Sequence, residues 1–182
     1  VDETARIPAP DGIAATSVLA IGLGRAEPSA ETLRSAAGTA ARALPTASRI
    51  AYALPAPSAA ETRAVLEGAA MGAYRYTAYR TGEVGPATSE IVAASSHEDA
   101  GAAAVAAGVI ADAVVLVRDL VNTPPNDLYP ASFVARARTA AEGLPLELEE
   151  WDAEALAAGG FGGILGVGQG SSRPPRLLAV RY

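Results

Sequence analysis

Short apolar runs alternate with helix-like segments along this chain, and the alternation predicts an α/β fold. Two further observations support this prediction. Residues that cap helices stand in front of the helix-like segments, and glycine or proline follows most of the apolar runs. We therefore expect a mixed or substantially parallel sheet flanked by helices.

The first half of the chain alternates strands and helices. Strands are expected at residues 4–8, 17–22, 49–54 and 90–94, and helices at about 28–44 and 58–80. The clearest helix start is a capping box, in which Ser58 occupies the N-cap and Glu61 stands three residues later. Apolar residues then recur at steps of three and four as far as Tyr79, which predicts one buried face along the whole of that helix.

An alanine-rich segment predicts the longest helix, from Glu98 or Asp99 to about Val121. Two glycines and two charged residues interrupt its apolar stretch, namely Gly101, Gly108, Asp112 and Arg118. A helix that spans a bilayer needs about 20 largely apolar residues in a row. We therefore expect a buried helix of a soluble protein and no membrane span.

The last third of the chain predicts shorter elements. A helix should start at Pro130, which suits the first turn, and run to about Glu142, where Gly143 ends it. The remaining predicted elements are a half-exposed strand at 144–150, a short helix that Asp152 caps and that Gly159 and Gly160 end, and strands at 164–165 and 177–180.

The composition excludes several classes of site. All 14 basic residues are arginine, so the chain has no phosphate-binding lysine, no Schiff base and no lysine general base. It contains no cysteine, which excludes disulfides and thiolate zinc sites. A net charge of −6 argues against a nucleic-acid surface. The first residues lack the pattern of a signal peptide, so we expect a cytoplasmic protein.

Two glycine-rich segments invite a nucleotide-binding interpretation, and both depart from the required pattern. A dinucleotide fingerprint is G-x-G-x-x-G between a strand and a helix. In Gly166–Gly170 the sixth position is Ser171, and prolines follow in place of a helix. After Gly22–Gly24 the corresponding position is Glu27, an acid where a phosphate would lie. A tight turn packed against another element is the better interpretation of the first segment.

The other residues that could carry chemistry have simple structural interpretations. His97 is the only histidine and precedes a helix, which suits a surface or capping residue better than a catalyst. Arg118 and Asp119 suit an ion pair at a helix end. The serines lack histidine and acid partners in a recognisable hydrolase pattern.

Two clusters remain. The densest acidic cluster is Glu147, Glu149, Glu150, Asp152 and Glu154. A carboxylate metal site is conceivable there, but a solvated strand edge is the better interpretation. Tyr74, Tyr76 and Tyr79 could form an aromatic patch, although helical core packing explains the last two. From the residues alone, the chain is a soluble, acidic α/β protein without a visible active site.

Three segments nevertheless form a recognisable set. They are residues 67–80, residues 118–126 with the sequence R-D-L-V-N-T-P-P-N, and residues 159–182 with the glycine segment and the turn from Arg173 to Arg176. In order and spacing they resemble the leucyl aminopeptidase family, the cytosolic two-metal peptidases of the M17 type. The first segment resembles a helix of the family that often ends in lysine, where this chain has Arg80. The resemblance covers essentially the whole chain.

The resemblance implies an enzyme that removes N-terminal residues from peptides and is typically a homohexamer. Two divalent metal ions, Mn or Zn, would generate the attacking hydroxide and stabilise the tetrahedral intermediate. Residues 1–97 would belong to an N-terminal α/β domain whose start is missing, residues 98–121 would form the connecting helix, and residues 122–182 would begin the catalytic domain.

The family's metal-binding and catalytic motifs follow the equivalent of Tyr182. The resemblance therefore assigns no catalytic, cofactor-binding or metal-binding residue to this chain, and we expect a fragment that is inactive alone. Two other interpretations stay open. The absence of catalytic motifs also fits a free-standing binding or assembly module. The other interpretation is nucleotide binding by the glycine segment, which would appear as thermal stabilisation by NAD or ATP.

Overall fold

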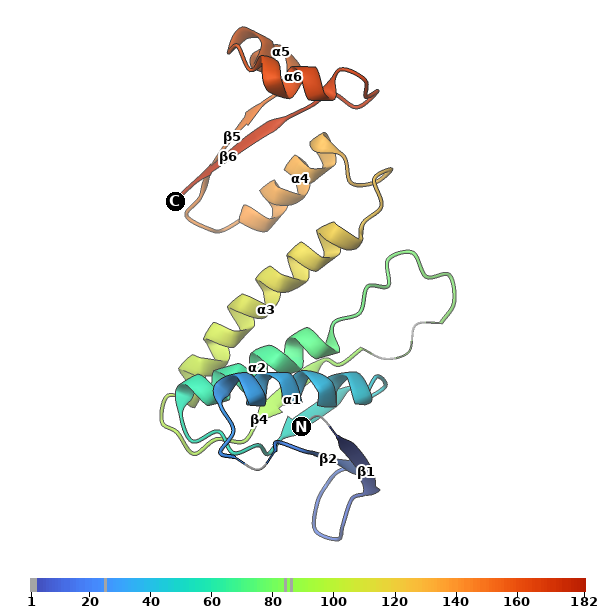
Figure 1. Cartoon of the computed structure of the whole chain (residues 1–182), viewed down its shortest axis with the longest axis vertical. Coiled ribbons are helices and arrows are strands. Elements are labelled where there is room, and N and C mark those ends of the chain that lie inside the picture. Colours follow the sequence, from blue (N-terminus) through green and yellow to red (C-terminus); the bar gives the residue numbers. More distant parts are fainter. Residues whose placement is uncertain (1–2, 25, 84, 86) are drawn as a thin grey trace. The chain divides into compact units, whose positions relative to one another are not determined.

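The computed structural model of this chain describes residues 3–24, 26–83, 85 and 87–182. The chain divides into two compact units, residues 1–118 and residues 119–182. Each unit combines helices with strands, which confirms the predicted mixed α/β class (Figure 1).

Within its described residues, the first unit carries four strands, two helices and most of a third helix. They are β1 (Thr4–Pro8), β2 (Ser17–Ile21), α1 (Ala30–Ala43), β3 (Arg49–Tyr52), α2 (Ala59–Ala73), β4 (Glu90–Ala93) and α3 (Ala100–Asn122). β1 pairs antiparallel with β2, whereas β3 pairs parallel with β4. Among the described residues of this unit, only β3 and β4 pair in parallel, so parallel pairing involves fewer strands than the sequence led us to expect.

The core of the first unit lies between α1, α2 and β3. The two helices lie side by side (Figure 1), and Leu33 of α1 and Val65 of α2 are fully buried. β3 alternates, so Ile50 and Tyr52 face this core. The hydroxyl of Tyr52 donates to the carbonyl oxygen of Ala37 at 3.0 Å. Burial raises the pKa of Tyr52 to about 12.

Glycine allows α1 and α2 to approach closely. A Cβ atom at Gly68 would lie 2.0 Å from the carbonyl oxygen of Arg34, and one at Gly72 would lie 2.3 Å from the carbonyl oxygen of Gly38. A side chain at either position would force the helices apart, because backbone atoms cannot yield as a flexible side chain can.

Both helices of this core start as predicted. The Ser29 hydroxyl caps α1 by accepting from the backbone N–H of Thr32 at 3.2 Å. The capping box of α2 is complete, since Ser58 Oγ accepts from the Glu61 N–H and the Glu61 carboxylate accepts from the Ser58 N–H. These local signals are confirmed.

The end of α2 was predicted wrongly. The helix ends at Ala73 and not at about Arg80, because the backbone of Tyr74 turns to φ −58° and ψ 132°. Tyr74, Tyr76, Thr77 and Tyr79 follow, and tyrosine and threonine have lower helix propensity than alanine. Arg118 also donates to the carbonyl oxygen of Met71 at 2.8 Å and so satisfies a group that the last turn leaves open.

α3 has the predicted span but is not the buried helix that we expected. All its residues are described, and only Ala103 and Ala107 are buried. Its most apolar 18-residue window has a mean hydropathy of 2.2 and is 11% buried. By length and composition alone it could cross a membrane, and no other helix in the described part of the chain could.

The second unit is described throughout. It contains α4 (Pro130–Ala141), β5 (Glu147–Trp151), α5 (Ala153–Ala158), α6 (Gly162–Gly168) and β6 (Leu177–Arg181). β5 and β6 form an antiparallel pair in which Trp151 stands opposite Leu177. Its only buried residues are Thr123, Val134 and Leu156.

Helix signals in the second unit are confirmed, while one strand is not. Pro130 begins α4, and Asp152 caps α5 by accepting from the Ala155 N–H at 2.9 Å. The strand predicted at 164–165 is wrong, because Ile164 and Leu165 lie in α6. Their N–H groups both donate to the Phe161 carbonyl oxygen, which starts a helical turn. A short apolar run between glycines fits either structure, so periodicity could not decide.

Candidate functional site

The glycine segment ends a helix and does not form a phosphate-binding loop. Gly166 and Gly168 belong to α6, so their N–H groups point along a helix instead of standing free at its N-terminus. A Cβ at Gly168 would lie 2.8 Å from Cγ of Pro175. Close packing against the proline turn therefore explains Gly168, as predicted. The tight turn predicted for the segment is wrong at Gly166 and Gly168, because both lie in α6.

The turn from Arg173 to Arg176 is tied to other elements of the second unit. The guanidinium carbon of Arg173 lies 3.8 Å from the centre of the Tyr129 ring, a cation–π contact. Arg176 donates to Glu150 at 3.0 Å, and the other oxygen of Glu150 accepts from Arg138 at 3.0 Å. The turn is thereby fixed over β5.

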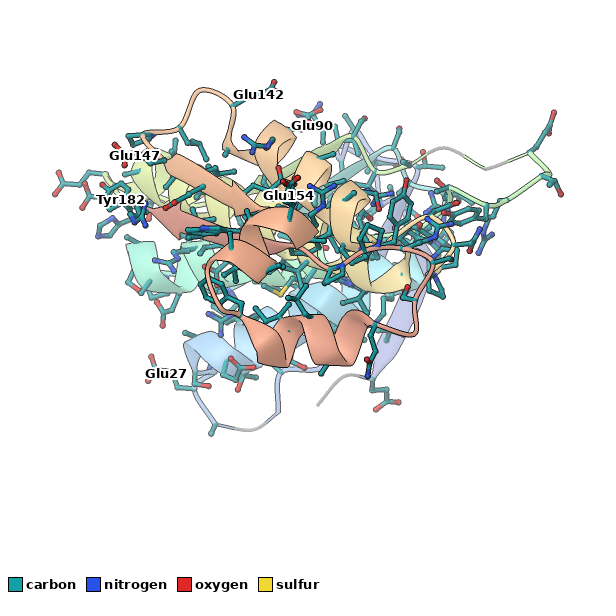
Figure 2. All side chains as sticks on the ribbon, turned by 90° about the horizontal axis from the view of Figure 1, so that it is seen from above. Glu27, Glu90, Glu142, Glu147, Glu154 and Tyr182 are labelled. Carbon is teal, nitrogen blue, oxygen red and sulfur yellow. The ribbon has the colours of Figure 1, made fainter. Side chains whose placement is uncertain are left out.

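The acidic cluster does not converge on one point. Glu149 pairs with Arg181 of the neighbouring strand at 2.7 Å, and Asp152 caps α5. Figure 2 shows Glu147 and Glu154 at separate places on the second unit. Within residues 3–24, 26–83, 85 and 87–182, no group of three or more His, Asp or Glu side chains is placed to hold a metal ion. The described residues therefore do not fit a metal centre.

His97 caps the start of α3. Its Nδ1 accepts from the backbone N–H of Asp99 at 3.1 Å, and its own backbone N–H donates to Ser95 Oγ at 3.3 Å. These contacts give the lone histidine the capping role that the sequence predicted.

The other glycine pair forms a connection between β2 and α1. The Gly22 N–H donates to the Glu3 carbonyl oxygen at 2.9 Å, which extends the pairing of β1 with β2. Gly24 has φ +90°, in the region that favours glycine. Backbone geometry accounts for Gly24 without a nucleotide.

Arg118 anchors α3 to the end of α2 within the first unit. Besides its bond to the Met71 carbonyl, its guanidinium carbon lies 4.0 Å from the centre of the Tyr74 ring. The helix-end ion pair between Arg118 and Asp119 stays a prediction. The contacts with Met71 and Tyr74 join Arg118 to the end of α2. The residue fixes two elements to each other.

The tyrosines do not form the predicted helical face. Tyr76 and Tyr79 follow the end of α2, and their ring centres are 6.0 Å apart at an angle of 46°. Tyr79 is half exposed, so core packing does not explain it. The aromatic pair lies in a surface turn of the first unit.

A small pocket lies at the C-terminal ends of α1 and α2. Its volume is about 150 Å³, and Arg42, Tyr74, Arg75 and Thr88 contribute to its lining. Ligand sites usually enclose about 300–1,000 Å³. The pocket is too small for a peptide substrate.

Sequence analysis missed a buried carboxylate. The Glu67 side chain is 5% exposed and accepts from Arg63 at 2.6 Å and from Arg34 at 3.0 Å. Burial alone would raise the pKa of Glu67, but the hydrogen bonds from Arg63 and Arg34 hold it below its usual value of 4.5. The spacing of Arg63 and Glu67, four residues apart on one helix, was an available signal. This network joins α2 to α1 and is structural.

Two family models match this chain. The model described as the N-terminal domain of the cytosol aminopeptidase family matches residues 1–83, and that family's catalytic-domain model matches residues 115–182. The chain belongs to the cytosol aminopeptidase family. The family resemblance is confirmed, because the two matches contain all three segments that carried it.

Curated relatives agree with this assignment. The probable cytosol aminopeptidase of Leifsonia xyli is 46% identical over 100% of this chain, and that of Clavibacter michiganensis is 47% identical over 100%. This chain spans only 36% and 38% of those two relatives. It therefore corresponds to a fragment of a cytosol aminopeptidase sequence.

Solved structures show the same fold. BotP, a bottromycin maturation enzyme solved in complex with Mn, superimposes with a TM-score of 0.86 and 34% identity, over 100% of this chain and 39% of BotP. A mutant of tomato leucine aminopeptidase gives a TM-score of 0.82 over 98% of this chain and 37% of its own. Its identity is 23%, so this second likeness shows the fold alone.

Proposed function

We propose that this chain is the N-terminal portion of a metal-dependent aminopeptidase that releases N-terminal amino acids from peptides. The observation that carries the proposal is the identity of 46–47% along the entire chain to proteins of which it spans little more than a third. Both domain types of the family match in the expected order.

Within that protein, residues 1–97 form the N-terminal α/β domain, residues 98–121 the connecting helix, and residues 122–182 the beginning of the catalytic domain. The division of the chain near residue 118 supports this assignment. The segment acts as a scaffold and in assembly, and it contributes no catalytic or metal-binding residue.

The complete enzyme holds two divalent metal ions, Mn or Zn, through ligands beyond Tyr182. The complex of BotP with Mn supports metal dependence. The complete enzyme is a cytoplasmic homohexamer with peptides as its substrates. The names of the curated relatives, which place them in the cytosol, support the location.

The product of the complete reading frame tests the proposal. It should hydrolyse an aminoacyl anilide in the presence of Mn²⁺, and a chelator should abolish this activity. The 182-residue chain assayed in parallel should be inactive. If the product of the complete reading frame showed no chelator-sensitive hydrolysis, the proposal would be contradicted. A reading frame that stops directly after Tyr182 would instead favour a free-standing assembly module.

A further inference from the structure

The pocket at the C-terminal ends of α1 and α2 is built entirely from the first unit. Three segments line it, namely the end of α1 with Pro45 after it, the end of α2 with Tyr74 and Arg75 after it, and Thr88 before β4. Its volume of about 150 Å³ is below the range of about 300–1,000 Å³ that holds drug-sized ligands. We call it the helix-end pocket, and its size suits a ligand of only a few non-hydrogen atoms.

The walls of the helix-end pocket are held in place by contacts of their own. The Thr88 hydroxyl donates to the carbonyl oxygen of Ala47 at 2.9 Å. The Tyr74 ring is fixed by the guanidinium of Arg118, whose carbon lies 4.0 Å from the ring centre. The close approach of the two helices at Gly72 sets the distance between their ends. The pocket is therefore largely formed before a ligand arrives, which lowers the cost of binding.

Positive charge lines the helix-end pocket. Arg42 and Arg75 both contribute to its lining, and both are exposed, so a ligand can reach them. Arg42 Nη2 donates to the Thr39 hydroxyl at 2.9 Å. Among the described residues, no carboxylate forms an ion pair with Arg42. Its guanidinium can therefore accept a carboxylate partner from a ligand.

Partial negative charge meets the same pocket. The last carbonyl groups of a helix have no N–H partner from a following turn, and they form the negative end of the helix dipole. The backbone leaves the helix at Tyr74 with ψ 132°, so no later helical turn reaches the carbonyl groups of Gly72 and Ala73. Both residues line the pocket, beside the C-terminal end of α1.

Together these groups select the charge of the ligand. A simple anion would suit the arginines but would be repelled by two helix C-termini, while a simple cation would suit the helix ends but would be repelled by the arginines. A small zwitterion satisfies both, with its carboxylate at an arginine and its ammonium group at helix-end carbonyl oxygens. We propose that the helix-end pocket binds a small free α-amino acid, such as alanine.

The proposed binding goes beyond the proposed function and does not require it. A free amino acid is also what an aminopeptidase releases, so the ligand would be a product of the complete enzyme. Only that link to the product rests on the proposed function.

Titration of L-alanine into the 182-residue chain, followed by ¹H–¹⁵N NMR, tests the binding. The amide signals of Gly72, Ala73 and Thr88 should shift and saturate with a dissociation constant on the order of 1 mM, because so small a ligand has little interaction energy to offer. N-acetyl-alanine lacks the ammonium group and alaninamide lacks the carboxylate. Each should bind at least about tenfold more weakly, since each leaves one half of the pocket unmatched.

Substitution of Arg42 separates binding from a purely structural role. A cation in the last turn of α1 also offsets the helix dipole, so Arg42→Gln should lower stability slightly whether or not a ligand binds. The proposal requires in addition that Arg42→Gln weaken alanine binding at least about tenfold. Arg42→Lys keeps the charge without the planar fork, so it should restore stability but only part of the affinity. Arg6→Gln is the control, because it removes the same charge from β1, which does not line the pocket.

Three results would overturn the proposal: no saturable shift with alanine, equal affinity for either blocked analogue, or unchanged alanine binding by Arg42→Gln whose spectrum shows it to be folded. The last result would leave Arg42 as a helix-end cation alone. Peptidase activity enters none of these measurements, so failure here is distinguishable from failure of the proposed function.

Discussion

The first unit encloses a core of apolar side chains between its own elements, whereas the second unit buries few of its apolar side chains. α1, β3 and α2 enclose a core that includes the fully buried Leu33 and Val65. The fully described second unit buries Leu156 and Val134 among its apolar residues and leaves Val167 92% exposed. The first unit therefore has a core of its own, and the second provides elements that need further partners.

The two units do not differ in how their helices are capped. Ser58 caps α2 and Asp152 caps α5 by the same type of contact. Yet α5 has six residues and α6 has seven, and isolated helices shorter than about 12–15 residues are marginal in water. Tertiary burial, and not capping, determines which unit can be stable alone.

Dividing the chain after Asn122, the last residue of α3, should give the largest effect. We expect residues 1–122 to unfold cooperatively on heating and residues 123–182 to show no cooperative transition, because the second piece lacks a core. Differential scanning calorimetry with circular dichroism measures this. A cooperative transition in residues 123–182 would contradict the claim that only the first unit has a core of its own.

Gly68→Ala should be the next most severe change. Its methyl group would collide with the Arg34 carbonyl oxygen, so α1 and α2 must separate, at a cost of about 1–3 kcal/mol or more. Gly108→Ala is the matched control, because its methyl group meets nothing in the exposed part of α3. Gly108→Ala should raise the unfolding free energy by about 0.5–1 kcal/mol, because alanine has a higher helix propensity than glycine. Urea unfolding of both variants measures these changes. Equal changes in unfolding free energy would contradict the close approach of α1 and α2.

Glu67→Gln should destabilise the first unit by about 1–3 kcal/mol, because two arginines lose a charged partner at a buried position. The folded-state pKa of Glu67 lies below its usual 4.5. Its contribution to stability is thus present above the unfolded-state pKa and is lost as pH falls through the folded-state pKa.

Urea midpoints measured from about pH 7 down to about pH 3 should show a weaker acid dependence in Glu67→Gln than in the unchanged protein. Glu90→Gln is the control, since the Glu90 pair with Arg49 is more than half exposed on both sides and should contribute less than about 1 kcal/mol. An equal loss of stability in the two variants would show that the burial of Glu67 has no consequence.

Removal of the two helix caps should give the smallest effect and the sharpest contrast. Ser58→Ala should lower the unfolding free energy of the first unit by about 1 kcal/mol. Asp152→Ala should leave that value unchanged and only reduce helical signal, because α5 belongs to the unit without its own core. A shift of the main transition by Asp152→Ala would show that the two units unfold together.

The sequence was sufficient for features set by neighbours in the chain. Ser29, the Ser58 box, Pro130 and Asp152 act within a few residues of their partners, so their roles could be predicted. The end of α2 depends on Arg118, which lies 47 residues from Met71. No local pattern could have shown that contact.

Burial was harder to predict than secondary structure. Apolar composition indicated that α3 needs cover, but it could not tell what provides it. Glu67 was missed because one of its partners, Arg34, lies 33 residues away on another helix. Composition and residue pattern could not identify a function for this chain, and only the three ordered segments of the family resemblance did so.

Calorimetric titration of Mn²⁺ into the 182-residue chain tests the central claim most directly, namely that the reactive centre lies outside these residues. With the first unit shown to be folded in the same sample, we expect no stoichiometric binding, while the complete product binds Mn²⁺ under identical conditions. Tight, stoichiometric binding by the 182-residue chain itself would contradict the account.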